Sequence, residues 1–227
     1  MFDFRFYEIW RSEEFVSVLL EGCFNSFWLT VVGGIFGFSL GIVLALLQDK
    51  NFFIGIRLLA RSYVEFIRNT PFVVQMFFVA FGLPLLLDLQ WSFYVSALLA
   101  ITLNFSAYFA EIIRSGIDST PNGQIEAAQS LGFKQRFIIR DIVLPQAIAK
   151  VYPSLVSQFV FLFLTTGLIS EIGVEDLTWA GRFISDRNFR DFEVYLLLTG
   201  LYMLMAWLFI LILNGIKKKV FPWWYAK

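Results

Sequence analysis

The sequence contains no histidine and only one cysteine, Cys23, among its 227 residues. One thiol excludes an intramolecular disulfide. Zinc, copper and haem sites are disfavoured, because their ligands are mainly imidazole and thiolate groups. A serine or cysteine triad with a histidine base is excluded. The dipeptide Gly-Lys, which a phosphate-binding loop requires, never occurs. If ATP drives this protein, another polypeptide binds the nucleotide.

Charged residues are also scarce, at 16% of the chain, whereas soluble domains carry about 25%. Hydrophobic residues make up 58% and form runs close to the ~20 residues that a helix needs to cross a bilayer. Four runs are clear and one is ambiguous, near residues 22–47, 64–87, 92–110, 146–170 and 194–216. The alternation of a membrane barrel is absent, so we expect an all-α membrane protein with about five transmembrane helices.

No polar stretch is long enough for an independent soluble core, the longest being 111–145 and 170–193. The first twenty residues are acidic, and the first hydrophobic run is too long for the core of a signal peptide. We therefore expect a single transmembrane domain over residues 1–227, with its core at 20–215, anchored by its own helices.

Lys and Arg are unevenly distributed between the two ends of the expected spans. Residues 1–21, 82–92 and 170–193 together hold five Lys/Arg and twelve Asp/Glu, whereas the other segments hold thirteen Lys/Arg and six Asp/Glu. Because basic residues gather on the cytoplasmic side, the second set is expected in the cytoplasm. The N-terminus is then outside and the C-terminus inside.

A polar segment between two apolar spans carries an acid, two small residues, a glycine and a proline at a characteristic spacing over twenty positions. The residues at this spacing are Glu126, Ala127, Ala128, Gly132, Ile142, Leu144 and Pro145. We expect Pro121 to end the extension of the third span and residues 124–131 to form a short helix with a flat surface at its two alanines. Gly132 suits a helix terminator. Residues 134–143 read as a second amphipathic helix that Pro145 breaks before the fourth span.

The spacing of this segment resembles the cytoplasmic "EAA" loop of ABC importer permeases. The resemblance implies the methionine-importer-type permease fold and a complex of two permease subunits, an ABC ATPase dimer and an extracytoplasmic substrate-binding protein. ATP and Mg²⁺ are then bound by the partner ATPase and not by this chain. The segment at about 115–145 would couple to the ATPase through Glu126, Ala127, Ala128, Gly132, Leu144 and Pro145.

Five further segments resemble the polar-amino-acid permeases of the histidine, glutamine and arginine branch. They are residues 63–75, 107–117, 121–128, 144–147 and 172–177, and the resemblance runs in register from about residue 20 to 215. It implies the membrane-spanning subunit of an ATP-driven importer of polar amino acids, in a bacterial-type cytoplasmic (inner) membrane. No contact with nucleic acid is implied, and the chain itself is not expected to be an enzyme.

The sequence departs from that branch in the fourth span. The branch usually carries a Lys-Asp pair there, where this chain has Leu164 and Thr165. A charged or zwitterionic substrate needs a fixed counter-charge in an apolar path. We therefore expect that a second, homologous permease chain supplies charged contacts, which makes the pair a heterodimer. Asn69, in place of the usual glycine before Thr70 and Pro71, is a milder change.

Several polar residues are expected at membrane depth and are candidates for the substrate path: Gln75, Asn104, Gln158, Thr165, Thr166 and Glu171. Uncharged residues of this kind often only tie helices together. The hydroxyls of Thr165 and Thr166 could line the path or bond to carbonyls within their own helix. Glu171 is expected near the outer interface, where a substrate ammonium or a receptor protein could meet it.

Two features of the first two spans have a structural and a functional interpretation. Gly33, Gly37 and Gly41 form a small-residue face that suits close helix packing or a specific subunit contact. Thr70 and Pro71 read as the N-cap and first residue of a helix that restarts after a break. Such a helix start could also attract a carboxylate. Gly82 and Pro84 are expected to mark its other end.

Two other functions remain as alternatives. A stand-alone secondary transporter would need carboxylates or histidines within the membrane for ion coupling, and only Glu171 is near it. An intramembrane enzyme would need a nucleophile with a base or a metal cluster, and the sequence offers no such pair.

Overall fold

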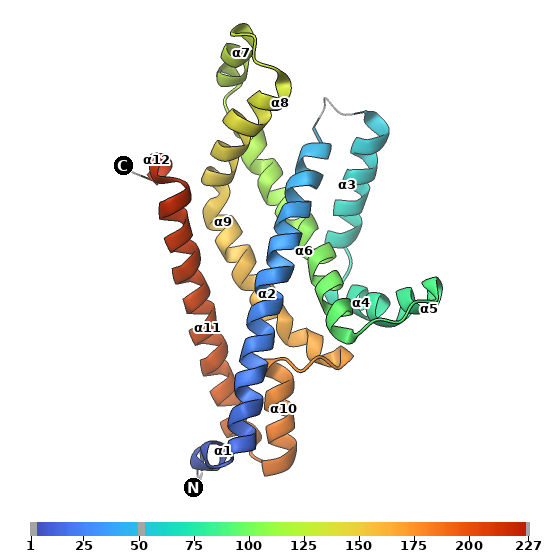
Figure 1. Ribbon diagram of the computed structural model, residues 1–227, viewed down its shortest axis with the longest axis vertical. Coiled ribbons are helices and arrows are strands. Elements are labelled where there is room, and N and C mark those ends of the chain that lie inside the picture. Colours follow the sequence, from blue (N-terminus) through green and yellow to red (C-terminus); the bar gives the residue numbers. More distant parts are fainter. Residues whose placement is uncertain (1–3, 50–52, 226–227) are drawn as a thin grey trace. The chain divides into compact units, whose positions relative to one another are not determined.

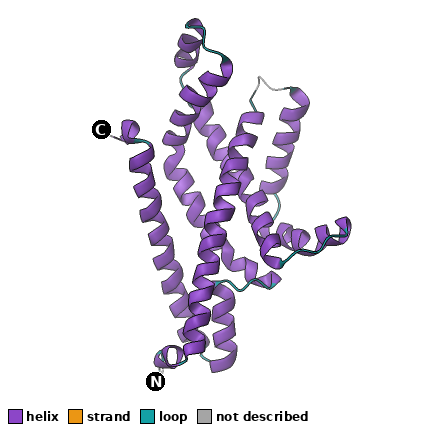
Figure 2. Ribbon diagram, viewed as in Figure 1, coloured by secondary structure: helices purple, strands orange, loops and turns teal. Residues whose placement is uncertain are grey.

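The computed structural model describes residues 4–49 and 53–225, and within them every regular element is helical (Figure 1, Figure 2). The all-α prediction is therefore confirmed. In chain order the elements are α1 (Tyr7–Arg11), α2 (Glu13–Leu47), α3 (Ile54–Arg68), α4 (Phe72–Phe77), η1 (Phe78–Gly82), α5 (Leu83–Leu87), α6 (Phe93–Asp118), α7 (Asn122–Ser130), α8 (Gln135–Phe137), η2 (Ile138–Val143), α9 (Leu144–Thr165), η3 (Thr166–Ile172), α10 (Leu177–Asn188), α11 (Asp191–Val220) and α12 (Pro222–Tyr225).

Four helical runs are long and apolar enough to cross a membrane. They are α2, α6, the run from Gln135 to Ile172, and α11. The pair of α3 with the helical run Phe72–Leu87 makes a fifth candidate if the break between them lies within one span. This agrees with the four clear spans and one ambiguous span that the sequence predicts.

The chain forms two compact units. Unit 1 comprises Met1–Ile35, Thr70–Thr102 and Phe159–Ile210, and unit 2 comprises Phe36–Asn69, Leu103–Gln158 and Leu211–Lys227. The predicted single domain over residues 1–227 stays a prediction. Unit 1 has a core in which α1 and the start of α2 pack on α10 and α11, through Ile9, Leu19, Leu177, Ala180, Ile184, Val194 and Leu198.

Glycines let α2 approach α6 closely within each unit. In unit 1, a Cβ on Gly33 would lie 2.7 Å from Cγ2 of Ile101. In unit 2, a Cβ on Gly41 would lie 2.7 Å from Cβ of Phe109 and 3.1 Å from the amide nitrogen of Ala110. Both positions therefore serve helix packing inside the chain, which is the structural interpretation of the small-residue face.

The start of α4 corrects the predicted cap by one residue. Pro71 takes the N-cap position, with φ −64° and ψ 135°, and makes no capping hydrogen bond through its own side chain. Its carbonyl oxygen accepts the N–H groups of Val74 and Gln75 at 3.1 and 3.2 Å. The Thr70 hydroxyl instead accepts a hydrogen bond from Nε2 of Gln75 at 2.5 Å. Proline precedes the helix rather than opening it, because its ψ is extended.

Two prolines predicted to end helices lie instead within continuous helical runs. Pro145 is in the first turn of α9, directly after the π-helical turn η2, and Pro84 is in α5, directly after the π-helical turn η1. A proline lacks an N–H group and its ring crowds the carbonyl four residues earlier. The wider π-turn removes that conflict. The predicted breaks at Pro145 and at Gly82 are therefore wrong.

Candidate functional site

The predicted coupling segment, residues 115–145, lies in unit 2 and forms a helical hairpin. Figure 1 shows α7 and α8 at one end of α6 and α9. The helix α6 ends at Asp118, and Pro121 occupies the N-cap position of α7 with an extended ψ of 128°. The short helix predicted at 124–131 is therefore present, beginning two residues earlier and ending at Ser130.

Gly132 ends α7 through a pair of backbone hydrogen bonds. Its own N–H group bonds to the Gln129 carbonyl at 2.9 Å, and the next N–H group, of Phe133, bonds to the Ala128 carbonyl at 3.2 Å. This is the Schellman arrangement, which needs a left-handed residue after the helix. Gly132 has φ +80°, and no atom lies within 4 Å of the place where a Cβ would be. The glycine is therefore required by its backbone angle and not by crowding.

The two alanines of the motif have different environments. Ala128 is buried and packs with Ile138 and Val143 of η2, and half-buried Ile125 extends this cluster. Ala127 is exposed on α7. The first alanine therefore gives α7 a smooth outer surface, whereas the second lets α7 approach η2 closely.

Glu126 is exposed, and its backbone carbonyl accepts a hydrogen bond from the Ser130 hydroxyl at 2.9 Å. Leu144 and Pro145 are half-buried at the start of α9. Gln146 links α9 to α7, because its Nε2 donates to Oε1 of Gln124 at 2.9 Å. The six predicted coupling residues thus lie on one hairpin, with Glu126, Ala127 and Gly132 exposed.

A polar hollow of about 590 Å³ lies beside this hairpin, within unit 2. Its lining comes from the end of α2, from α3, α6 and α7, and from the segment that leads into α9. Half of its lining residues have charged or carboxamide side chains, including Gln48, Arg61, Arg114, Asp118, Glu126 and Gln135. The hairpin therefore borders a recess that can receive polar groups of another molecule.

The predicted path residues of unit 1 bond mainly within their own segments. Thr165 donates to the Phe161 carbonyl at 2.7 Å and Thr166 donates to the Phe163 carbonyl at 2.6 Å. Both hydroxyls thus take the intrahelical alternative. Glu171 is exposed and accepts a hydrogen bond from Nη2 of Arg182 at 2.5 Å. Gln75, as described above, bonds to Thr70.

The other two predicted path residues, Asn104 and Gln158, lie in unit 2. Asn104 is buried on α6. Gln158 lies on α9, and its buried Nε2 has no hydrogen-bond partner among the residues that the structure describes. An unpaired amide away from water is unfavourable by about 1–3 kcal/mol, so this donor suits an acceptor from another molecule. The six path residues are thus divided between the units and do not form one site within either.

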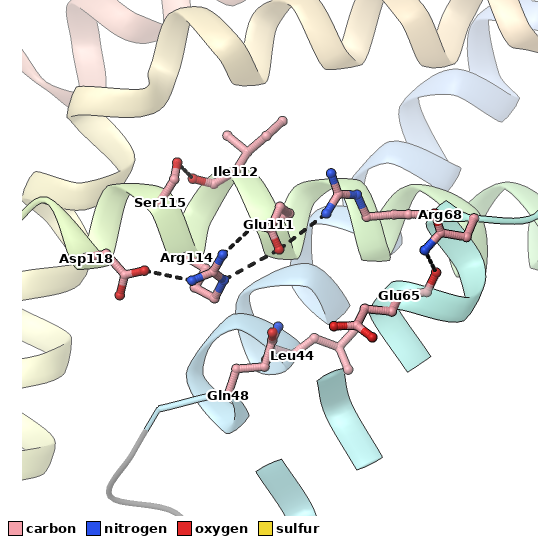
Figure 3. Close-up of polar contacts among 10 residues, drawn as sticks. Leu44, Gln48, Glu65, Arg68, Glu111, Ile112, Arg114, Ser115 and Asp118 are labelled. Atoms are coloured by element: carbon pink, nitrogen blue, oxygen red, sulfur yellow. Dashed lines mark hydrogen bonds and ion pairs between the residues drawn. The ribbon is translucent and has the colours of Figure 1, made fainter. Parts of the chain in front are cut away.

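A cluster of charged side chains on α6 lies mostly in segments that resemble the amino-acid permeases, but the sequence analysis assigns it no function. Glu111 bridges Arg68 at the end of α3 and Arg114 on its own helix, and Arg114 also contacts Asp118 (Figure 3). The spacing of Glu111, Arg114 and Asp118, at three and four residues, is a sequence signal for neighbours on one helix face. The contribution of Arg68 from α3 is not predictable from that spacing.

A second feature that sequence reasoning missed is the buried carboxylate of Asp176 in unit 1. It caps α10 by accepting the Trp179 N–H group at 2.8 Å. The Tyr202 hydroxyl lies 3.5 Å from its other oxygen and 2.7 Å from the Thr178 hydroxyl. Burial raises the pKa of Asp176 to about 7, although the Trp179 and Thr178 N–H groups lower it. The carboxylate therefore titrates near neutral pH.

Curated relatives match most of the chain. The arginine transport system permease protein of Bacillus subtilis is 38% identical over 164 residues, which cover 71% of this chain and 74% of that protein. The glutamine transport system permease protein of Escherichia coli is 30% identical over 213 residues, which cover 93% of this chain and 95% of that protein. The predicted resemblance to amino-acid permeases is therefore confirmed.

Solved structures share the fold over nearly the full length. An amino acid ABC transporter crystallised with histidines matches with a TM-score of 0.84 and 29% identity, covering 96% of this chain and 100% of that chain. The MetNI methionine ABC transporter matches with a TM-score of 0.78 and 18% identity, covering 92% and 99%, which confirms the predicted permease fold. A family model for the binding-protein-dependent transport system inner membrane component matches residues 37–223, and the chain belongs to that family.

Proposed function

We propose that this chain is the membrane-spanning subunit of an ATP-driven importer of polar amino acids and that residues 115–145 couple it to a separate ATPase. Family membership makes the chain a permease component. The relatives that transport arginine and glutamine, together with the transporter crystallised with histidines, support polar amino acids as the substrate class.

The exposed surface of α7 is the observation that supports coupling. Glu126 and Ala127 are exposed on this helix, while Ala128 holds its other side against η2. Gly132 stops the helix so that Leu131 and Phe133, which are 77% and 53% exposed, lie at the tip. Large exposed apolar side chains next to a flat polar helix suit a protein partner rather than water. The ATPase would contact this surface.

ATP and Mg²⁺ would be bound by the partner ATPase dimer. The sequence lacks the Gly-Lys dipeptide of a phosphate-binding loop, which supports binding of the nucleotide by the partner and not by this chain. An extracytoplasmic binding protein would deliver the amino acid to the opposite face. Closure of the ATPases on ATP would open the path to the outside. Hydrolysis of the ATP would then close the path to the outside again.

The orientation follows from charge. Thirteen of the eighteen Lys/Arg residues belong to the segments assigned to the cytoplasm, which include the coupling segment. The N-terminus would then lie outside and the C-terminus inside a bacterial-type cytoplasmic membrane. The coupling segment faces the compartment that contains ATP.

A homologous, different permease chain would complete the membrane part. Leu164 and Thr165 stand where related permeases carry Lys-Asp, and the hydroxyls of Thr165 and Thr166 are already bonded within their helix. This segment thus offers no fixed charge to an amino acid, so the partner chain would supply it. Co-expression with the ATPase and the binding protein, without another permease, tests the heterodimer. Robust uptake by that minimal set refutes it.

Reconstitution in liposomes tests the function itself. The chain is purified with the ATPase and the second permease, the binding protein is added outside, and uptake of a panel of radiolabelled amino acids is measured with and without internal ATP. We expect uptake of one or a few polar amino acids that depends on ATP and on the binding protein. Uptake driven by an ion gradient without ATP would instead identify a secondary transporter.

A further inference from the structure

Glu111 is shared by two arginines that come from different helices of unit 2. Its Oε2 lies 3.4 Å from Nη1 of Arg68, and its Oε1 lies 2.5 Å from Nη2 of Arg114 (Figure 3). The guanidinium of Arg68 also lies over the ring of Tyr108, at 5.8 Å from its centroid. Two residues of α6 therefore hold the side chain of the last residue of α3.

The cluster continues along α6 to the start of the coupling segment. Nη1 of Arg114 lies 2.8 Å from Oδ2 of Asp118, the last residue of α6. Glu111 precedes Asp118 by two helical turns, or about 10 Å. The ion pairs thus join the end of α3 to the part of α6 from which α7 follows.

The charges in this cluster are paired, which leaves two arginines and two carboxylates without a net charge. The side chains of Arg68, Glu111 and Arg114 are 39%, 29% and 34% exposed, so each is partly shielded from water. A carboxylate that is already fixed by one arginine loses less side-chain freedom when it binds a second. Such a shared pair fixes distance and direction more closely than an isolated surface pair.

Among the described residues, a neutral side-chain contact also joins α3 to α6. The Tyr63 hydroxyl donates to the Leu103 carbonyl at 2.9 Å and lies 3.0 Å from Oγ of Ser106. Leu103 and Ser106 lie about two turns and about one and a half turns before Glu111 on α6. This contact therefore attaches the middle of α3 to α6, whereas the charged cluster holds the end of α3.

We propose that Glu111 is a positioning residue that holds the end of α3 to the last turns of α6 through Arg68 and Arg114, so that a displacement of the coupling segment moves α3 as well. The inference rests on the proposed function. Without the Glu111 charge, α7 and α6 still respond to the ATPase, but α3 follows less closely, and more ATP is hydrolysed for each amino acid transported.

The test replaces Glu111 with glutamine, which keeps the size of the side chain and removes its charge. Glu65→Gln on α3 is the matched control, because Glu65 is exposed and its carboxylate is in none of these ion pairs. Each variant is reconstituted with the ATPase, the second permease and the binding protein. ATP hydrolysis and amino-acid uptake are then measured in the same liposomes.

For Glu111→Gln we expect kcat for uptake to fall about fivefold at an unchanged KM, with ATP hydrolysis retained, so that ATP used per amino acid rises about fivefold. The control should keep the wild-type ratio. A variant that assembles less well but keeps the wild-type ratio per assembled complex would show a merely structural role and overturn the proposal. Absence of ATP-dependent uptake by the wild type would refute the proposed function instead.

A double-mutant cycle provides the second test. Arg68→Met alone should reproduce the loss of coupling, and Arg68→Met with Glu111→Gln should be no worse than either single variant, because the same contact is already lost. Independent effects that multiply in the double variant would show that Glu111 does not act through Arg68, and would overturn the proposal.

Discussion

The carboxylate of Asp176 accepts the backbone N–H group of Trp179 at 2.8 Å, and the Asp176 side chain is fully buried. A carboxylate usually caps a helix at the protein surface, where its charge stays hydrated. Here burial raises its pKa to about 7. The charge of this cap therefore changes near neutral pH.

The first prediction concerns the pH dependence of stability. The folded-state pKa of about 7 lies above the ordinary value of 3.8, so between these two values the folded state binds a proton that the unfolded state does not. The stabilisation from this group is complete below the ordinary value and is lost as pH rises through about 7. Asp176→Asn keeps a cap that does not titrate. The melting temperature of this variant should therefore fall less between about pH 5 and pH 8 than the melting temperature of the wild type.

Melting of the purified protein in detergent checks this. The control is Asp186→Asn, because Asp186 is exposed and lies on the same helix, α10. Asp176→Ala should be less stable than Asp176→Asn at every pH, by about 1 kcal/mol, because it removes the cap. Equal pH slopes for the wild type and Asp176→Asn would contradict the prediction.

The second prediction separates the two alanines of the coupling segment. Ala128→Leu should destabilise the hairpin by about 1–3 kcal/mol, because Ala128 packs on Ile138 and Val143. Ala127→Leu should change stability by no more than about 0.5 kcal/mol, because Ala127 is exposed. It should nevertheless weaken copurification with the ATPase, since the added bulk lies on the outer surface of α7. Unchanged ATPase binding by a stable Ala127→Leu variant would count against this surface.

The third prediction concerns Gly132. Its φ of +80° is tolerated by asparagine and aspartate but not by a β-branched residue. Gly132→Val should therefore disturb the end of α7, while Gly132→Asn should retain most uptake. Gly132→Asp has nearly the same shape as the Asn variant and adds a negative charge at the tip, so uptake and stimulated ATP hydrolysis should fall about fivefold relative to Asn. Equal activity of the two variants would exclude the charge effect.

The fourth prediction concerns topology. In a Cys23→Ser background, Asp186→Cys should react with a membrane-impermeant thiol reagent from outside, and Gln135→Cys only from inside. Both side chains are exposed, so accessibility does not limit the reaction. Asp186 is preferable to Asp88, whose φ of 51° would strain a cysteine. Labelling of position 135 from outside would reverse the orientation and remove the coupling segment from the ATPase.

Much of this protein follows from local sequence. The spans could be predicted because each must satisfy its own backbone in lipid, which leaves long apolar runs that can be counted. The turn at Gly132 could be predicted because a glycine after a short helix provides the left-handed residue that ends it. The spacing of Glu126, Gly132 and Pro145 indicated the family because each residue type there has a separate physical role.

Other features were decided by contacts between distant residues. Arg68 lies beside Glu111 only because α3 packs on α6, and Asp176 is buried only because α10 packs on α11 and the start of α2. Ala127 and Ala128 are identical in sequence and differ only in what faces them. The helix at Pro145 was also not predictable from local sequence. The conflict between the proline ring and the carbonyl four residues earlier predicts a break in the helix, whereas the chain widens into the π-turn η2 and stays helical. Sequence fixes the conformations that a residue tolerates, and tertiary packing selects among them because burial and pairing depend on partners far along the chain.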